Sequence, residues 1–332
     1  MTSSDLSRIL RIAEDSKTAL IIGHAHPDGD CVGSAMALCE IAEALGCKAT
    51  LLLPDPVPLR LAFLLGERQA LNEVPEDLDA YTIITVDVAS PTQLGDLKDA
   101  LADKVALRID HHDVGTPYAK AEFVDPRAAA TGEIIFDLYE HAIATGKLKA
   151  PLPRALYAMF GAISSDTGCF KYANVTGGTH LRAAKLIDTG VAAAEINRLL
   201  FETKDASQLR AEGVAQRKLQ LFADGKISCI AIDRGDYTDG ISIGDFDTAI
   251  DIARSVRGSL CAAVIKASLT KENTYRASLR SIGLNVAAVA ERFGGGGHVR
   301  AAGCSLECAS IEEALRTIVA ALTEAIEAEK NA

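Results

Sequence analysis

The densest group of chemically useful side chains lies in the segment HAHPDGD at residues 24–30. It follows a short apolar run at residues 18–23, which predicts a buried strand, and it precedes a helical pattern. The proline and glycine of this segment favour a tight turn that can aim Asp28 and Asp30 at one point. Together with His24, these carboxylates make the segment a candidate metal-binding loop.

Three further acidic or histidine segments follow apolar runs in the first half of the chain. Asp87 comes after an expected strand at residues 81–86, and Asp110-His111-His112 comes after an expected strand at residues 104–109. Asp166 follows another apolar segment, in the motif SSDTG. Ligands of open α/β sheets bind at the carboxyl ends of the strands. We therefore expect these side chains to meet at one edge of one sheet.

Four of these aspartates, Asp28, Asp30, Asp87 and Asp166, carry four negative charges, which two divalent cations would neutralise. Without metal the carboxylates would repel one another, and the pKa of at least one would rise. Mixed oxygen and imidazole ligands favour manganese, iron or cobalt over magnesium. Two ions about 4 Å apart can stabilise both the attacking and the leaving oxygen of a phosphoryl group. The pattern predicts a hydrolase with two divalent ions, Mn²⁺ first among them.

A second candidate site lies near the C-terminus, where four glycines at residues 294–297 precede His298. Glycines permit close backbone approach and a nest of N–H groups for an anion, and a helix starting after them would add its dipole. Upstream, Arg276 and Arg280 would share one face of an expected strand and could form a phosphate clamp. The candidate backbone contacts to substrate are Gly295, Gly296 and Gly297.

The pattern of expected elements indicates two α/β domains. Short apolar strands alternate with helical segments in the first half, which predicts a parallel, doubly wound sheet. Residues 131–221 are mostly helical in pattern, with Thr131 as an N-cap. We expect a catalytic domain at residues 1–190, a helical linker at 191–224 and a smaller α/β domain at 225–332. Within the linker, residues 205–221 resemble a polar connecting helix.

Composition narrows the class of substrate. The 332 residues carry a formal net charge of −11, whereas proteins that track long nucleic acid carry a basic stripe. An acidic chain favours short anionic substrates over long duplexes. The N-terminus lacks the uninterrupted apolar region of a signal peptide, and no stretch reaches membrane-spanning length, so we expect a cytoplasmic protein. The eight cysteines include no C-x-x-C pair and are expected to be reduced thiols, most of them buried.

The order of the motifs resembles a known family. H-x-x-x-D-x-D, D-x-A-S, D-H-H and D-T-G, followed by G-G-G-G-H, are similar to those of the DHH phosphoesterases that carry a DHH-associated domain. The resemblance covers residues 15–325 and is greatest to the stand-alone nanoRNases, which also act as 3′-phosphoadenosine 5′-phosphate phosphatases. It implies an active site in the cleft between a DHH domain and a DHH-associated domain, with a homodimer as one arrangement.

The resemblance also implies roles for individual residues. The implied ligands of the first metal are His24, Asp28 and Asp87. The implied ligands of the second metal are Asp30, Asp87, His111 and Asp166. His112 would act on the substrate alongside the bridging Asp87, while Asp110 would orient an imidazole from behind. His298 and Arg280 would hold the nucleotide. His26 occupies a variable position and is left out of the ligand set.

Several readings share this chemistry. The first is hydrolysis of RNA a few nucleotides long, together with removal of a 3′-phosphate from a mononucleotide. The second is a stand-alone phosphodiesterase for cyclic dinucleotides or their linear products. A RecJ-type exonuclease fits the length and charge less well, and a family-II pyrophosphatase would lack the glycine-rich histidine segment. A nucleotide-binding regulator with a dead site would have no need of the complete Asp and His set.

Overall fold

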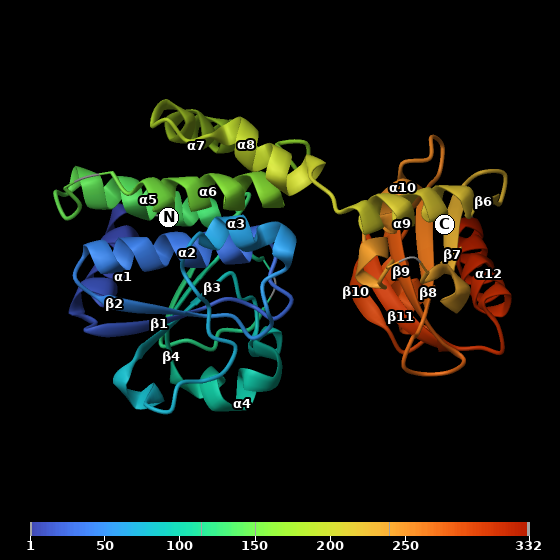
Figure 1. Ribbon diagram of the computed structural model, residues 1–332, viewed down its shortest axis with the longest axis horizontal. Coiled ribbons are helices and arrows are strands. Elements are labelled where there is room, and N and C mark those ends of the chain that lie inside the picture. Colours follow the sequence, from blue (N-terminus) through green and yellow to red (C-terminus); the bar gives the residue numbers. More distant parts are fainter. Residues whose placement is uncertain (1, 114, 150, 239, 331–332) are drawn as a thin grey trace. The chain divides into compact units, whose positions relative to one another are not determined.

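A computed structural model describes residues 2–113, 115–149, 151–238 and 240–330 of the chain (Figure 1). The chain divides into two compact units, Met1–Thr203 and Lys204–Ala332. Each unit has its own sheet and its own hydrophobic core. Among the described residues, no helix combines the length and the apolar character needed to cross a membrane.

The first unit is built on a five-stranded sheet in which all neighbouring strands are parallel, with the order β2-β1-β3-β4-β5. The strands are β1 (Thr18–Ile22), β2 (Lys48–Leu52), β3 (Thr82–Val86), β4 (Val105–Asp110) and β5 (Ala121–Val124). The order changes direction between β1 and β3, which is where ligands bind in such sheets. The predicted parallel, doubly wound sheet is confirmed.

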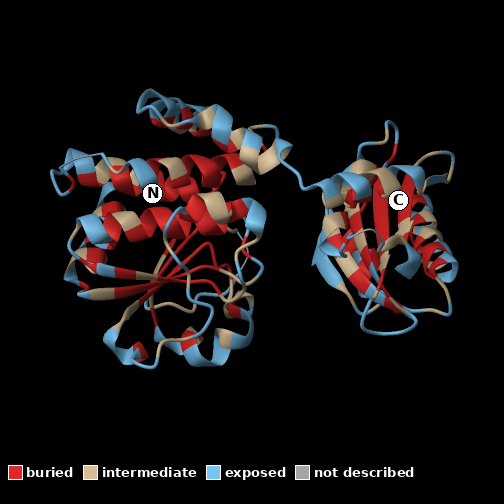
Figure 2. Ribbon diagram, in the orientation of Figure 1, coloured by how far each residue is buried: buried red, intermediate tan, exposed pale blue. Residues whose placement is uncertain are grey.

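Both faces of this sheet are buried, as the composition of its strands requires. In β1, Ala19 and Ile21 belong to one apolar cluster, whereas Leu20 and Ile22 belong to another on the opposite face. Figure 2 shows the central strands as buried, with exposed residues concentrated on the outer surfaces of the surrounding helices and loops. An apolar run without alternation is therefore the correct signature of these strands.

Most helices of the first unit lie on one side of the sheet, while α4 lies on the other side (Figure 1). The helices are α1 (Ser3–Asp15), α2 (Gly29–Ala44), α3 (Ala62–Leu65), α4 (Lys98–Leu101), α5 (Thr131–Ala144), α6 (Pro153–Asp166), α7 (Gly177–Asp188) and α8 (Ala193–Asn197). Short 3-10 turns at Leu78–Ala80, Pro91–Leu97 and Ala102–Lys104 complete the α4 side.

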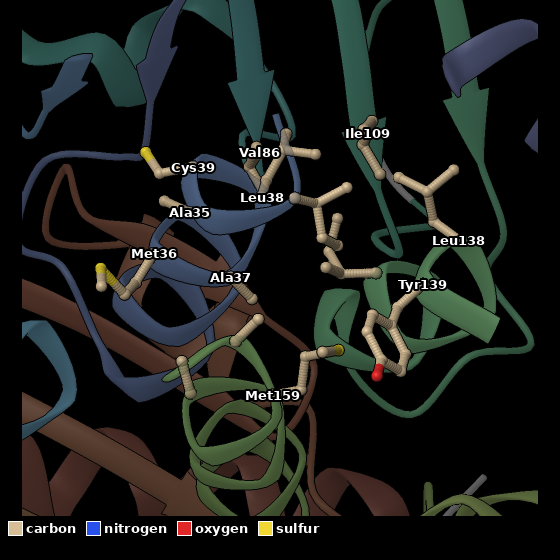
Figure 3. Packing of buried hydrophobic residues seen from close by; sticks show 14 of the residues in the cluster. Ala35, Met36, Ala37, Leu38, Cys39, Val86, Ile109, Leu138, Tyr139 and Met159 are labelled. Carbon is tan, nitrogen blue, oxygen red and sulfur yellow. The ribbon is translucent and has the colours of Figure 1, made fainter. Parts of the chain in front are cut away.

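Helix α2 is buried over most of its length, and Figure 3 shows its residues 35–39 among side chains from α5 and α6, including Met159. Gly33 permits this packing, because a Cβ atom there would lie 2.5 Å from the carbonyl oxygen of Ala158 in α6. A Cβ at Gly29 would likewise lie 2.3 Å from the hydroxyl of Ser165. The start of α2 and the end of α6 are therefore in contact.

The second unit has a six-stranded mixed sheet with the order β10-β11-β9-β8-β7-β6. Its strands are β6 (Leu219–Phe222), β7 (Ile227–Ile232), β8 (Cys261–Ala267), β9 (Thr274–Ser281), β10 (Gly296–His298) and β11 (Ala301–Glu307). The pair β7–β8 is parallel and the other pairs are antiparallel. Its helices are α9 (Ala206–Arg217), α10 (Ala249–Arg254), α11 (Val286–Glu291) and α12 (Ile311–Lys330).

The two faces of this second sheet differ. Helices α11 and α12 pack on one face, against alternate residues of β7, β8, β9 and β11. On the other face, α9 and α10 cover β7 and β8. On β9 and β11 the residues of that other face are exposed or half-buried. We call this area the open face; its residues are Arg276, Ser278, Arg280, Ala301, Gly303 and Ser305.

Three local expectations are corrected. Residues 205–221 are not a polar connector: helix α9 ends at Arg217, and its Ala211 and Ala215 are fully buried in the second unit's core. The last residues of the expected helix form β6, which pairs with β7. The glycine run leads into the hairpin β10–β11 and not into a helix. Two alanines spaced four residues apart can bury one face of a helix without forming an obvious apolar stripe. The burial of α9 could therefore not be recognised from the sequence.

Candidate active site

The first group of donor atoms lies at the ends of β1 and β3. Nε2 of His24 is 3.7 Å from Oδ1 of Asp28 and 3.6 Å from Oδ2 of Asp87. His24 follows β1, Asp28 is the N-cap of α2, and Asp87 follows β3. The carboxylate of Asp28 also accepts a hydrogen bond from the N–H of Cys31 at 3.0 Å, which fixes it against the helix start.

The second group surrounds Nε2 of His111, which follows β4 and Asp110. This nitrogen is 3.8 Å from Oδ2 of Asp30, 3.5 Å from Oδ2 of Asp166 and 3.7 Å from Oδ1 of Asp87. Asp30 comes from the first turn of α2, and Asp166 is the last residue of α6. Contact between these two helix ends, which Gly29 permits, brings the two aspartates to one histidine.

Asp87 belongs to both groups, since Oδ2 faces His24 and Oδ1 faces His111. The residue is 1% exposed, and its backbone has a φ of 61°, in the left-handed region. Residues other than glycine rarely adopt this conformation, and such strain concentrates at functional sites. Its own N–H donates to the carbonyl of Ile109 at 2.9 Å, which anchors the strained turn to β4.

The distances within the two groups, 3.5–3.8 Å, are too long for direct hydrogen bonds. Two atoms bound to one cation at about 2.0–2.2 Å each lie roughly 3–3.5 Å apart, so the distances here are at or slightly above those of shared coordination. One donor atom from each of His24, Asp28 and Asp87, and one from each of Asp30, His111 and Asp166, lie within 4.8 Å of one another. Carboxylate oxygens with imidazole nitrogens suit divalent metal ions. By geometry and donor type, the residues fit two such ions.

The electrostatics of the site also call for cations. Burial, with the nearby Asp87, Asp166 and Asp28, raises the pKa of Asp30 well above its ordinary value. Burial likewise raises the pKa of Asp166, to about 6. For His24, burial lowers the pKa, but the contacts to Asp28 and Asp87 outweigh this and raise it. The expectation that at least one clustered carboxylate would shift upward is confirmed.

Asp30 is held by the start of α5. Its two oxygens accept the N–H groups of Thr131 at 2.7 Å and Gly132 at 2.9 Å, and the hydroxyl of Ser34 donates to it at 2.8 Å. The prediction that Thr131 is the N-cap is wrong, because Ala130 occupies that position and Asp30 supplies the acceptor. The hydroxyl of Thr131 donates to Oδ1 of Asp87 at 2.9 Å instead.

Asp110 lies behind the histidines, as expected, and is fully buried. Its Oδ1 accepts the N–H of His111 at 2.8 Å and contacts Nδ1 of His112 at 2.7 Å. Its Oδ2 accepts from the guanidinium of Arg108, which is also buried and also binds Glu122 at 3.0 Å. The bond to Asp110 raises the pKa of His112. Arg108 was not predicted, since an arginine inside an apolar strand carries no recognisable motif.

The other three histidines of the first unit, including His26, lie outside these groups of donor atoms. His26 is exposed, with a φ of 55°, and pairs with Asp55 at 2.9 Å. His141 bonds the hydroxyl of Ser7 at 2.8 Å, and His180 stacks on Phe170. All eight cysteines are free thiols, of which six are buried.

Comparison with known proteins gives this arrangement a family. The profile of the DHH family N-terminal domain matches residues 18–163, and that of the DHHA1 domain matches residues 225–328. The two matches together cover well over half of the chain. The chain belongs to the DHH family. The first unit is therefore the DHH unit and the second the DHHA1 unit.

Curated relatives resemble the chain along most of its length. The bifunctional oligoribonuclease and PAP phosphatase NrnA of Thermus thermophilus is 28% identical over 306 residues, covering 92% of this chain and 89% of that protein. The cyclic-di-AMP phosphodiesterase GdpP of Bacillus subtilis is 26% identical over 95% of this chain but only 49% of its own length. An exopolyphosphatase-related protein from Bacteroides fragilis has the same fold, with a TM-score of 0.88, 20% identity and 97% and 96% of the two chains covered.

In the DHHA1 unit, His298 and Arg280 lie in one row across the sheet. His298 of β10 is opposite Ala301 of β11, which is opposite Arg280 of β9. Directly opposite residues of antiparallel strands point to the same face, so both candidate side chains flank a small alanine on the open face. Two strand spacings separate them, about 9–10 Å.

The glycine run has two functions in the hairpin. A Cβ at Gly295 would lie 2.2 Å from the carbonyl oxygen of Gly303, and Gly297 has a φ of 144°. Packing and backbone conformation therefore require glycine at these two positions. A Cβ at Gly296 would meet nothing within 4 Å, so this glycine leaves room for a ligand. Arg276, not Arg280, lines the cavity of about 450 Å³ beside the run.

Proposed function

We propose that the chain is a metal-dependent phosphoesterase that hydrolyses short oligoribonucleotides to mononucleotides and 3′-phosphoadenosine 5′-phosphate to AMP. The observation that carries the proposal is the pair of donor groups that share Asp87, each facing one of its carboxylate oxygens. A shared carboxylate holds two cations at the separation that in-line displacement at phosphorus requires. Similarity to NrnA over nearly the full length of both chains supports the substrate class.

In this proposal His24, Asp28 and Asp87 hold one ion, and the other is held by Asp30, Asp87, His111 and Asp166. Manganese fits the mixed nitrogen and oxygen donors better than magnesium does. When bound, the ions supply a polarised water and neutralise phosphate charge. Hydrogen bonds hold the reacting side chains in position: Thr131 holds Asp87, Ser34 holds Asp30 and Asp110 holds His112. Little reorganisation is therefore needed during the reaction.

His112 acts on the substrate in this scheme. Asp110 accepts the Nδ1 proton of its imidazole at 2.7 Å, which leaves Nε2 for the substrate. Because that bond raises the pKa of His112, the ring keeps its second proton to a higher pH. Nε2 can then donate a hydrogen bond to a phosphate oxygen, or a proton to the leaving oxygen. Asp87 contributes through the ions that it holds.

The alternative substrate is a cyclic dinucleotide or its linear product, since the cyclic-di-AMP phosphodiesterase GdpP is 26% identical over 95% of this chain. The chain spans about half of GdpP but nearly all of NrnA, and this favours the oligoribonuclease over the cyclic dinucleotide phosphodiesterase. We further propose that the enzyme acts in the cytoplasm, on short RNA and not on long duplexes. A homodimer is part of the proposal and would be tested by light scattering.

A substrate panel tests the proposal. Purified protein with Mn²⁺ would be given a two-nucleotide RNA, 3′-phosphoadenosine 5′-phosphate, a cyclic dinucleotide and a 24-nucleotide RNA, with Asp28→Ala as the inactive control. We expect the highest kcat/KM on the first two substrates and at least about tenfold less on the others. A clear preference for the cyclic dinucleotide would establish the alternative. No metal-dependent hydrolysis of any substrate would overturn both.

A further inference from the structure

The DHHA1 unit contains a cavity of about 590 Å³ at the end of β9 that carries Arg280. Three guanidinium groups line it: Arg280 itself, Arg254 at the end of α10 and Arg300 in the turn between β10 and β11. A carboxylate, Asp251, also lines the cavity and pairs with Nε of Arg254 at 2.9 Å. The lining thus has three cationic side chains and one anionic side chain, although the chain as a whole has a formal net charge of −11.

The guanidinium groups are held against the cavity wall. Arg280 donates from Nη1 to the carbonyl of Leu279 at 2.9 Å, and Arg300 donates from Nη1 to the carbonyl of Ile282. Burial lowers the pKa of Arg280, so its positive charge is incompletely solvated. Arg254 and Arg300 are exposed. A set of anchored cations that includes one partly desolvated arginine favours an anion of high charge that several N–H groups can bind together.

One rim of the same cavity is apolar. Leu260 and Ile282 line it and are 42% and 66% exposed. The N–H of Ile282 donates to the carbonyl of Leu260 at 3.0 Å, so the backbone fixes this rim. An apolar rim beside a cationic wall suits a ligand with a sugar or base next to a phosphate.

This cavity is distinct from the one at the glycine run, where Arg276 lies. Arg276 and Arg280 are four residues apart on β9, which separates them by about 13 Å. The open face therefore offers two separate anion positions along one strand. A ligand with a single phosphate cannot use both.

We propose that Arg254, Arg280 and Arg300 bind the terminal phosphomonoester of the substrate, the phosphate that is not cleaved. A phosphomonoester carries about −1.5 to −2 charges near pH 7, whereas an internal phosphodiester carries one. The cavity thus selects 5′-phosphorylated dinucleotides and nucleoside bisphosphates over dinucleotides with a free 5′-hydroxyl. The inference rests on the proposed function and names the part of the substrate that the DHHA1 unit binds.

Binding without turnover tests the assignment. The full chain would be titrated calorimetrically in chelator with a diadenosine dinucleotide, with and without its 5′-phosphate. We expect the phosphorylated form to bind at least about tenfold tighter, as charge-assisted hydrogen bonds predict. Arg254→Gln and Arg300→Gln should each reduce that ratio several-fold while changing the affinity for the unphosphorylated form less than about twofold. Inorganic phosphate should compete with the phosphorylated form alone.

Arg257→Gln is the matched control, since it removes the same charge three residues from Arg254 and lies outside the cavity lining. It should leave the ratio unchanged. Equal affinity of the wild type for both dinucleotides, or an equal loss with Arg257→Gln, would overturn the assignment. Because the titration needs no hydrolysis, a protein that binds as expected but cleaves nothing with Mn²⁺ would instead count against the proposed function.

Discussion

In the DHH unit each buried candidate ligand has a second partner that fixes it: Asp30 binds the start of α5, and Asp87 binds the hydroxyl of Thr131. In the DHHA1 unit Arg276 and His298 are exposed on the open face, and the candidate contact Arg280 is half-buried there. Buried, fully bonded charges place a small number of atoms reproducibly. Exposed side chains can adapt to a ligand, and salt screens the contribution of an exposed charge such as that of Arg276.

This difference indicates a division of labour, with bond cleavage in the first unit and recognition in the second. Changes in the DHH site should therefore act on every substrate alike. Changes on the open face should depend on which substrate is offered.

Metal removal should have the largest effect. Chelator should reduce turnover of both a dinucleotide and a nitrophenyl phosphodiester to background, because the proposed ions supply the attacking water and neutralise the charge of the phosphate. Added Mn²⁺ should restore it better than Mg²⁺. Rates would be measured by product chromatography and by absorbance. Equal activity in chelator and in Mn²⁺ would exclude the two-metal hypothesis.

Asp87→Asn should come next, with a loss of at least about 10²-fold in kcat on both substrates, since it removes the charge that both groups share. Asparagine tolerates the left-handed backbone at this position, so the fold should persist.

The substitution Asp110→Asn should reduce kcat on both substrates by roughly 10–100-fold. Because it also deprives buried Arg108 of an ion pair, its Tm must be compared with that of the wild type. A much larger loss in the folded Asp110 variant would reverse the assigned roles.

His298→Ala should separate the units. We expect KM for a dinucleotide to rise about tenfold, as the loss of one charge-assisted contact predicts, with a smaller fall in kcat. The small nitrophenyl ester should be affected much less, because it has no second nucleotide to bind. Asp28→Ala should abolish turnover of both. Equal losses on the two substrates for His298→Ala would place this histidine in the chemistry.

Cys31→Ser should have the smallest effect. The sulfur is fully buried and accepts the N–H of His24 at 3.2 Å, a bond that a serine hydroxyl can also accept. We expect activity within about twofold of the wild type and a Tm lower by a few degrees, the ordinary cost of a polar atom in an apolar position. A large loss of activity in a folded variant would mean that the thiol contacts an ion or the substrate.

Strand ends were the most predictable part of the site. His24, Asp87 and His111 each follow an apolar run, and the topology of parallel strands brings such positions together. Strand β5 escaped prediction because only two of its four residues, Ala121 and Phe123, are buried. A run that short carries too little pattern to stand out.

The partners that fix the ligands were less predictable. Thr131 and Ser34 lie 101 and 4 residues from Asp30, and nothing in the local pattern distinguishes them from capping or surface hydroxyls. The arginine cavity depends on a helix end, a strand and a turn that meet only in three dimensions. Long-range side-chain pairing of this kind follows from the packing and not from periodicity.

The hydrogen bonds from Thr131 and Gly132 make Asp30 necessary to the start of α5 as well as to the metal site. A descendant of this chain released from selection for catalysis would still need an acceptor there. The side chain of Asp28 is 52% exposed, and its hydrogen bond from Cys31 caps only the helix to which it belongs. Substitutions of Asp28 would therefore be accepted early in such a lineage, and substitutions of Asp30 late. A degenerate relative could keep Asp30 intact long after it had ceased to be an enzyme.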